Sequence, residues 1–304
     1  WSLVVRGASP VLNSPVSWPS WFRNDSMVKK TPAVNDEDFA AVLADKLADS
    51  RKYRRLGIPR ETVLDLINKA SLTHTSSREI EEVVRRKMHN LVAPYLGEPD
   101  YTLLQSRIAE LPRDLHAEEV SRFCLEVLNT HASTRERVPI HAEFYSRLFA
   151  AAGTPAVILD LACGMHPFAL PWMNLPPSTH YFAYDLHQPR IELINTFFEH
   201  FGQAGHAVKQ DILLDPPADE TATVFFFKEA HRFEQRENGS VRSFLHRLAS
   251  QQILLSLPVE TLSGRRSMLD QDRRLVTSAC ADTNWQVTEL FFSTEIVFFI
   301  RKDA

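Results

Sequence analysis

Cysteine is scarce in this sequence, and the positions of the few cysteines exclude two kinds of site. The 304 residues include three cysteines, Cys124, Cys163 and Cys280. They are far apart and form no CxxC pair, so they predict neither a disulfide framework nor a zinc site. The pattern favours a reducing, cytoplasmic compartment, and Cys163 is read as a packing residue rather than a nucleophile.

Long apolar runs and net positive charge are also missing. No apolar run approaches the length needed to cross a bilayer, so we expect no membrane association. The formal net charge is -4, which means that a nucleic-acid partner would have to be held by a local basic patch. Several histidines have no metal-ligand spacing to a cysteine or carboxylate, and we expect no metal site. These are His131, His141, His166, His187 and His231.

Glycine is infrequent, but one glycine marks the centre of the pattern. Gly164 follows the apolar stretch 157–162, and a glycine just past a buried strand lets the backbone turn close to a ligand. A dinucleotide fingerprint needs three glycines there, whereas this turn continues with Met165, His166 and Pro167. A ligand with adenosine and no pyrophosphate, such as S-adenosylmethionine (SAM), therefore fits better than NAD. A strand–turn–helix without a ligand remains the alternative.

Polar residues follow the next predicted strands. Asp185 comes after 181–184, Asp211 after 207–210 and Lys228 after 224–227. In open α/β sheets the ligand lies at the carboxyl ends of the strands, and an acidic residue after the second strand holds a ribose. The alternative is that the two aspartates cap the following helices.

The order of predicted elements indicates the fold class. Strand and helix signals alternate after residue 153, and two more strands at 286–292 and 295–301 are close enough to pair as a hairpin. We predict an α/β fold of the class I SAM-dependent methyltransferase type. This is a doubly wound, mostly parallel sheet with a C-terminal antiparallel hairpin, preceded by an all-α N-terminal domain.

Composition and periodicity divide the chain into three parts. Residues 1–35 combine tryptophans, prolines and serines without a signal-peptide pattern, and we expect a disordered leader, with Met27 as a candidate natural start. Residues 36–152 carry six apolar stripes of helical period, which predict a helical domain. Residues 153–304 form the predicted SAM-binding methyltransferase domain.

Two basic clusters lie in the predicted helical domain. One occupies residues 46–60 with only Asp49 as a counter-charge, and the other is Arg85, Arg86 and Lys87. Charge runs are usually solvated faces, but patches of this kind are also what recognition of an RNA backbone requires.

Specific segments carry a resemblance to one family. HASTRER at 131–137 and LDLACGMHPFAL at 159–170 resemble the 16S ribosomal RNA (guanine-N7) methyltransferases that confer aminoglycoside resistance. Further agreement covers most of the chain from about Asp36 onward. It comes from 52–53, 86–89, 93–95, 184–188, 209–213 and 227–228.

This resemblance implies a function. Such enzymes bind the assembled 30S subunit and methylate N7 of guanine 1405 in the decoding site of 16S rRNA, which blocks 4,6-disubstituted deoxystreptamine aminoglycosides. The expected cofactor is SAM, the partner is 16S rRNA within the 30S subunit, and the protein acts as a monomer. The RNA-binding residues implied are Lys52, Arg54, Arg55, Arg86, Lys87, His89 and Arg265.

The resemblance also implies roles at the cofactor site. Arg137 would hold the SAM carboxylate, although a surface salt bridge with Glu136 or Glu143 is the alternative. Gly164 would line the methionine end, Asp185 would accept the ribose hydroxyls and Asp211 would receive the adenine amino group. The full set of cofactor-binding residues implied is Arg137, Ala162, Gly164, Asp185, Leu186, Asp211, Ile212, Phe227 and Lys228.

The chemistry agrees with the lack of a catalytic acid–base pair in the sequence. Guanine N7 carries a free lone pair, and the thioether leaving group needs no acid. The reaction therefore needs two reactants held in line rather than a general base. The target base would first have to leave its stack.

Two segments depart from the family pattern. Residues 229–233 are Glu-Ala-His-Arg-Phe where the family has a leucine-rich turn, and residues 263–269 keep Gly264 and Arg265 but lose the rest of the loop motif. Two alternatives stay open at this point. One is a diverged methyltransferase that acts on another RNA or a small molecule, and the other is a non-catalytic ribosome-binding homologue.

Overall fold

The computed structural model describes residues 37–51, 53–54, 57–92, 99–259 and 269–302. The predicted leader at 1–35 lies outside the described residues, as do Lys52, Arg55, Arg265 and the segments 93–98 and 260–268. No helix within the described ranges is long and apolar enough to cross a membrane.

A seven-stranded sheet forms the centre of the described chain. Its strand order is β3-β2-β1-β4-β5-β7-β6, and β7 runs antiparallel to β5 and β6 while the other pairs are parallel. This confirms the predicted doubly wound sheet with a C-terminal hairpin. The bounds are β1 Val157–Leu161, β2 His180–Asp185, β3 Gly205–Lys209, β4 Thr223–Phe227, β5 Gln252–Pro258, β6 Gln286–Phe291 and β7 Glu295–Arg301.

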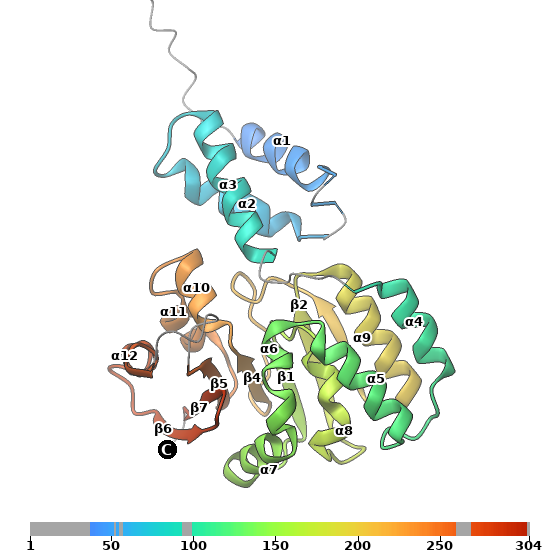
Figure 1. Cartoon of the computed structure of the whole chain (residues 1–304). Coiled ribbons are helices and arrows are strands. Elements are labelled where there is room, and N and C mark those ends of the chain that lie inside the picture. Colours follow the sequence, from blue (N-terminus) through green and yellow to red (C-terminus); the bar gives the residue numbers. More distant parts are fainter. Residues whose placement is uncertain (1–36, 52, 55–56, 93–98, 260–268, 303–304) are drawn as a thin grey trace, which may run out of the picture. The chain divides into compact units, whose positions relative to one another are not determined.

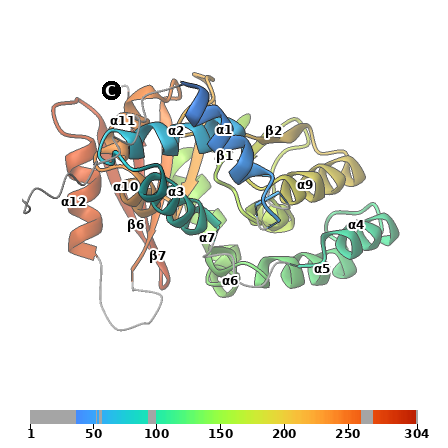
Figure 2. The same cartoon turned by 90° about the horizontal axis from the view of Figure 1, so that it is seen from above.

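Helices cover both faces of the sheet (Figures 1 and 2). Successive strand residues point to opposite faces. Phe225 and Phe227 of β4 therefore join one hydrophobic cluster, while Val224 and Phe226 join the other. The first cluster includes α4 Tyr101–Glu110, α5 Glu118–Asn129, α7 His141–Ala152 and α9 Gln188–Phe201. The second includes α10 Ala230–Arg236, α11 Ser240–Arg247 and α12 Leu269–Ala279.

Short helical turns connect the outer helices to the ends of the strands. Between α5 and α7 lie α6 Ala132–Arg135 and the 3-10 turn η2 Val138–Ile140, with Arg137 just before η2. After β1 come the 3-10 turn η3 His166–Ala169 and α8 Leu170–Met173. Both connections bring the segments of the HASTRER and LACG motifs to the sheet.

Helices α1 Glu37–Ala48, α2 Arg60–Ser71 and α3 Ser77–Val92 have a hydrophobic cluster of their own. Leu47, Val63 and Met88 are completely buried in it. Helices α4, α5 and α7 instead share their core with the sheet, so the packing differs from the single helical domain predicted for 36–152. The physical reason is that helical periodicity shows which face of a helix is buried but not what it packs against.

Candidate active site

Strained backbone marks the carboxyl ends of two neighbouring strands. β1 and β4 pair in parallel, and each is followed by a residue other than glycine with positive φ, Ala162 at 53° and Lys228 at 60°. The left-handed region costs a residue with a Cβ about 1–2 kcal/mol, and such strain is concentrated at functional sites. The two strand ends lie where the strand order reverses, which is where open α/β sheets bind ligands.

The turn after β1 is built around Gly164. Its φ is 55°, and a Cβ added there would lie 3.1 Å from Cε1 of His131. The Gly164 N–H donates to Oδ2 of Asp185 at 3.0 Å. One glycine thus joins the turn after β1, the end of β2 and the segment before α6. The adjoining Cys163 is buried, and burial raises the pKa of its thiol well above the usual value, as expected of a packing residue.

Asp185 at the end of β2 is buried and fully engaged. Besides the Gly164 N–H, its carboxylate accepts from the His187 N–H at 2.9 Å and from Nη1 of Arg190 at 2.8 and 2.9 Å. Burial by itself raises the pKa of Asp185, but the Arg190 charge and these hydrogen bonds lower it below the ordinary value. The carboxylate is therefore ionised and fixed in place, with the half-buried Leu186 next to it.

Asp211 follows β3 and contacts helices distant in the sequence. Its Oδ2 accepts from the Thr62 hydroxyl of α2 at 2.8 Å and lies 2.7 Å from Nη1 of Arg236 on α10. Its Oδ1 accepts from the same nitrogen at 2.9 Å and from the Leu213 N–H at 3.2 Å. The next residue, Ile212, is buried in the core on the α10 face.

Arg137 is 2% exposed and makes a bidentate ion pair. Its Nε and Nη2 donate to the two carboxylate oxygens of Glu295, the first residue of β7, at 2.8 and 2.6 Å. The guanidinium carbon lies 4.4 Å from the ring centre of Phe144 and 4.7 Å from that of Phe227. The partner is a buried glutamate, so neither surface pair considered from the sequence, with Glu136 or Glu143, is the one formed.

Lys228 extends this charged cluster. Its Nζ lies 2.8 Å from Glu136 and 3.7 Å from Glu295, and the Lys228 side chain is 5% exposed. Burial alone raises the pKa of Glu295, but the charges of Arg137 and Lys228 lower it to about 2. Two cations and two carboxylates thus meet beside the end of β4, and Glu136 is the most exposed of the four.

The sequence matches the model of the family described as Ribosomal RNA methyltransferase (FmrO) over residues 49–300. The chain belongs to this family. Similar curated proteins, each named 16S rRNA (guanine(1405)-N(7))-methyltransferase, include one from Frankia casuarinae (strain DSM 45818 / CECT 9043 / HFP020203 / CcI3). That protein is 28% identical over 278 residues, which cover 89% of this chain and 96% of the relative. Another, from Micromonospora rosea, is 27% identical over 269 residues, which cover 86% and 96%.

Solved structures agree with the fold of this FmrO-family methyltransferase. The 16S rRNA methylase RmtB is 21% identical with a TM-score of 0.71, covering 87% of this chain and 98% of its own. The 16S rRNA methyltransferase RmtF, solved in complex with S-adenosyl-L-homocysteine, is 23% identical with a TM-score of 0.72, covering 88% and 99%. The predicted class I methyltransferase fold is thereby confirmed.

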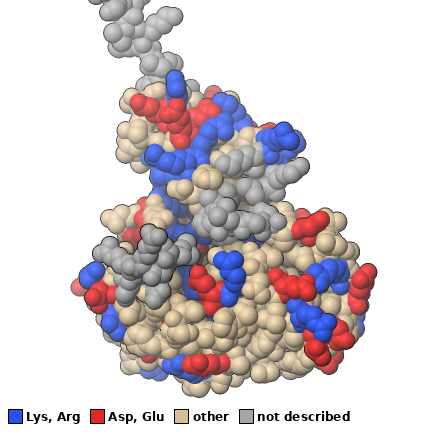
Figure 3. Space-filling model, viewed as in Figure 1, with Lys and Arg blue, Asp and Glu red and all other residues tan. Residues whose placement is uncertain are grey.

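A group of basic residues of this FmrO-family methyltransferase lies on α1–α3 and the turn between α1 and α2, with acidic residues beside them, while other basic residues are spread over the rest of the face (Figure 3). Arg54, Arg86 and His89 are exposed and Lys87 is half-buried. Lys46 and Arg85 both pair with Glu81, and Arg60 pairs with Asp45. Neither Arg54 nor Arg86 forms an ion pair with another described residue.

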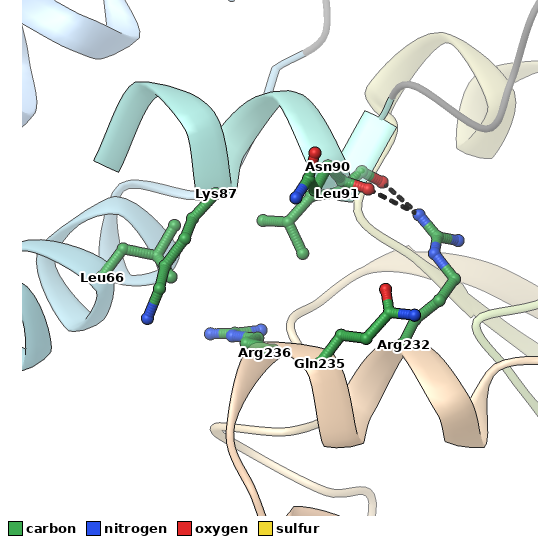
Figure 4. Close-up of a pocket in the computed structure, with 7 residues that line it drawn as sticks. All are labelled: Leu66, Lys87, Asn90, Leu91, Arg232, Gln235 and Arg236. Carbon is green, nitrogen blue, oxygen red and sulfur yellow. Dashed lines mark hydrogen bonds between the residues drawn. The ribbon is translucent and has the colours of Figure 1, made fainter. Parts of the chain in front are cut away.

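The segment that departs from the family pattern makes polar contacts with other elements. Arg232 donates to the Leu91 carbonyl at 2.7 Å and the Asn90 carbonyl at 3.2 Å, at the end of α3 (Figure 4). Nε2 of His231 lies 2.7 Å from Oδ1 of Asp272 on α12. Burial raises the pKa of Glu229, which pairs with Arg232. The loop at 263–268 lies outside the described residues.

Sequence reasoning missed several residues of this site. Glu295 pairs with Arg137, Arg190 with Asp185, and Thr62 and Arg236 with Asp211. A signal existed for Glu295, because it is an acidic residue directly before the apolar run 296–300. No group of three or more histidine, cysteine, aspartate or glutamate residues in the described part of the chain could hold a metal ion.

Proposed function

We propose that this FmrO-family protein transfers a methyl group from SAM to N7 of guanine 1405 in 16S rRNA of the assembled 30S subunit. The observation that carries the proposal is the family match over residues 49–300. It is strengthened by curated relatives that align over most of their length and share the name for this reaction. Methylation of this base would give resistance to 4,6-disubstituted deoxystreptamine aminoglycosides.

The strand ends fit an adenosine-containing methyl donor. Gly164 lacks the Cβ that would collide with His131, and Asp185 is an ionised carboxylate at the end of β2, where such sheets hold a ribose. A ribose hydroxyl would replace one of the donors that Asp185 now has. Asp211 would accept a hydrogen bond from the adenine amino group. Arg137 would hold the carboxylate of SAM with the guanidinium hydrogens that Glu295 does not use. Ala162, Leu186, Ile212, Phe227 and Lys228 would border the bound molecule.

The chain's own part in the reaction is to position the reactants. When bound, SAM supplies a methyl group on a cationic sulfur. Because guanine N7 loses no proton, the site needs no general base. The rate enhancement would come from holding the two reactants in the correct orientation. The strained residues Ala162 and Lys228 fix the ends of β1 and β4, the two strands between which the strand order reverses. The buried charges of Arg137, Lys228 and Glu295 are held by ion pairs and need not reorganise.

The helical segment α1–α3 would supply the RNA contacts. Arg54, Arg86, Lys87 and His89 are the described residues of the proposed RNA-binding set, with Lys52, Arg55 and Arg265 as its further members. Such a substrate implies action in the cytoplasm. We propose a monomer, because the exposed large apolar side chains of the described residues are scattered rather than gathered in one patch.

The test uses purified protein, labelled SAM and intact 30S subunits, followed by mapping of the modified nucleotide. We expect label at N7 of guanine 1405 and none on free 16S rRNA. The matched control is Asp185→Asn, which removes the ionised acceptor and should reduce both labelling and binding of S-adenosylhomocysteine. Susceptibility to 4,6-disubstituted deoxystreptamines, measured in a host that expresses the chain, provides the cellular readout.

Three other outcomes would reject the proposal. Label in tRNA or in a metabolite pool, with none in 30S subunits, would indicate a diverged methyltransferase. Co-sedimentation with ribosomes, without methyl transfer or S-adenosylhomocysteine binding, would indicate a non-catalytic homologue. Label on another 16S nucleotide would keep the enzyme class and reject the target.

A further inference from the structure

We infer that Thr62 of α2 competes with the adenine amino group for Oδ2 of Asp211, so that seating of α1–α3 against the sheet opposes cofactor binding. This inference rests on the proposed function, because it takes Asp211 as the acceptor of the adenine amino group. It assigns to α2 a regulatory contact with the cofactor site.

The acceptor capacity of Asp211 supports competition. An ionised carboxylate has about four lone-pair directions. Oδ1 already accepts from the Leu213 N–H and from Nη1 of Arg236, while Oδ2 accepts from the Thr62 hydroxyl and lies 2.7 Å from the same Arg236 nitrogen. A further N–H donor must therefore replace one of these. The Thr62 hydroxyl is the neutral donor that comes from a separately packed element, so it is the one we expect to leave.

Burial supports the same conclusion. Thr62 is completely buried and Asp211 is 4% exposed, so the helix bearing Thr62 covers the carboxylate. An adenine amino group can approach Oδ2 within hydrogen-bond distance only if the Thr62 hydroxyl withdraws. Movement of one neutral hydroxyl is less costly than separation of the buried charge pair between Arg236 and Asp211.

The contacts between α1–α3 and the rest of the chain allow such a movement. The hydrophobic cluster of α1–α3 is separate from the two clusters of the sheet. Several contacts between the described residues of the two parts are polar: Arg236 to Asp65 at 3.0 Å, Lys69 to Glu237, and Arg232 to carbonyls in the last turn of α3. Polar interfaces of this kind can part without exposing a large apolar area. Figure 4 shows Arg236 and Arg232 of α10 facing α2 and α3.

Linkage between the two events must be reciprocal. If cofactor binding displaces Thr62, it loosens α2, and anything that draws α2 away from Asp211 strengthens cofactor binding. Docking of α1–α3 on ribosomal RNA would be such an event. The cofactor would then bind more tightly on the ribosome than in the free protein.

Calorimetric titration of S-adenosylhomocysteine into the full chain tests the competition. Thr62→Val keeps the side-chain shape and removes the donor. A typical net hydrogen bond corresponds to about a two- to tenfold change in an equilibrium constant, so the Kd should fall about two- to tenfold. The matched control is Ser71→Ala on the same helix, whose hydroxyl donates only to the Ile67 carbonyl, and its Kd should equal that of the unmodified protein. In an Asp211→Asn background, Thr62→Val should have a much smaller effect.

A second measurement uses the unmodified chain, in case Thr62→Val does not fold. Saturation with S-adenosylhomocysteine should speed hydrogen exchange of the α2 amides while slowing it around β1 and β2. An unchanged or higher Kd for Thr62→Val, or slower exchange in α2 on saturation, would overturn the inference and leave the proposed function intact. If the unmodified protein binds no S-adenosylhomocysteine, the proposed function fails instead.

Discussion

Three carboxylates at the carboxyl-terminal side of the sheet are each paired with a buried arginine. Glu295 pairs with Arg137, Asp185 with Arg190 and Asp211 with Arg236. A buried ion pair adds little net stability, because the loss of hydration offsets the attraction, but removal of one partner leaves an uncompensated buried charge. At the scale of single residues, these pairs keep fixed charges at the ligand edge of the sheet.

Glu295→Gln should lower the free energy of unfolding by about 3–5 kcal/mol at pH 7, because it leaves Arg137 buried without its counter-charge. The folded-state pKa of Glu295 is lowered from 4.5 to about 2. Its contribution is therefore present above pH 4.5 and lost as the pH falls toward 2. The difference between the two proteins should shrink over that range in urea unfolding. Glu289→Gln, which removes the partner of the exposed Arg273, should show little difference at any pH.

At the scale of elements, the turn after β1 connects the site. Gly164 has a positive φ, lies against His131 and donates a hydrogen bond to Asp185. Ala162, two residues earlier, also has a positive φ. The turn thus depends on three segments that are far apart in the sequence. A change in it should affect both stability and ligand binding.

Gly164→Ala should destabilise the protein more than Gly202→Ala does. Both positions have positive φ, so both substitutions introduce left-handed strain of about 1–2 kcal/mol. A Cβ at Gly202 meets nothing within 4 Å, whereas a Cβ at Gly164 lies 3.1 Å from the His131 ring. Thermal unfolding compares the stabilities and calorimetry the affinity for S-adenosylhomocysteine, which only Gly164→Ala should weaken. Equal losses for the two variants would contradict this account of the turn.

At the scale of the whole molecule, buried histidines control the response to mild acid. Burial, with Arg190 for two of them and Arg137 for the third, lowers the pKa of His131 to about 3, His187 to about 4 and His141 to about 3. All three are therefore neutral in the folded protein at pH 5 and largely protonated in the unfolded chain, whose histidines titrate near 6.5. For these three groups the unfolded state binds more protons, so their contribution lowers the stability as the pH decreases below 6.5.

The free energy of unfolding should decrease by about 1.4 kcal/mol per pH unit for each such histidine once the pH is well below 6.5. Glu229 acts in the opposite direction, because burial raises its pKa in the folded state. Urea unfolding at several pH values between 7.5 and 5 measures the slope. His187→Asn removes one of the three histidines and should reduce this slope by about 1.4 kcal/mol per pH unit. A free energy of unfolding that stays constant over this range would contradict the prediction.

Binding of 30S subunits should depend on the exposed basic residues of α1–α3. Arg86→Ala should weaken binding and reduce the slope of log affinity against log salt by about 0.7–0.9 if Arg86 contacts one phosphate. Arg122→Ala on α5, where the arginine pairs with Glu118, serves as a control of equal charge change. Co-sedimentation with 30S subunits at several salt concentrations measures the affinity and its salt dependence for each variant. Identical slopes for the two variants would show that Arg86 does not contact the RNA.

The sequence by itself determined the local features of this protein. Apolar strands, the glycine after β1 and acidic residues after β2 and β3 follow from short-range patterns, and the doubly wound class of the sheet follows from the succession of strands and helices. The family motifs at 131–137 and 159–170 lie in contiguous segments, so the family resemblance could also be found from sequence.

Only the tertiary structure decided which groups meet. Arg137 pairs with a glutamate 158 positions away, and Asp211 accepts from a threonine 149 positions away. Helices α4, α5 and α7 pack on the sheet, whereas α1–α3 form a separate cluster. The physical reason is that periodicity and propensity act over a few residues. The partner of a buried charge or an apolar face is instead set by how the chain returns through space.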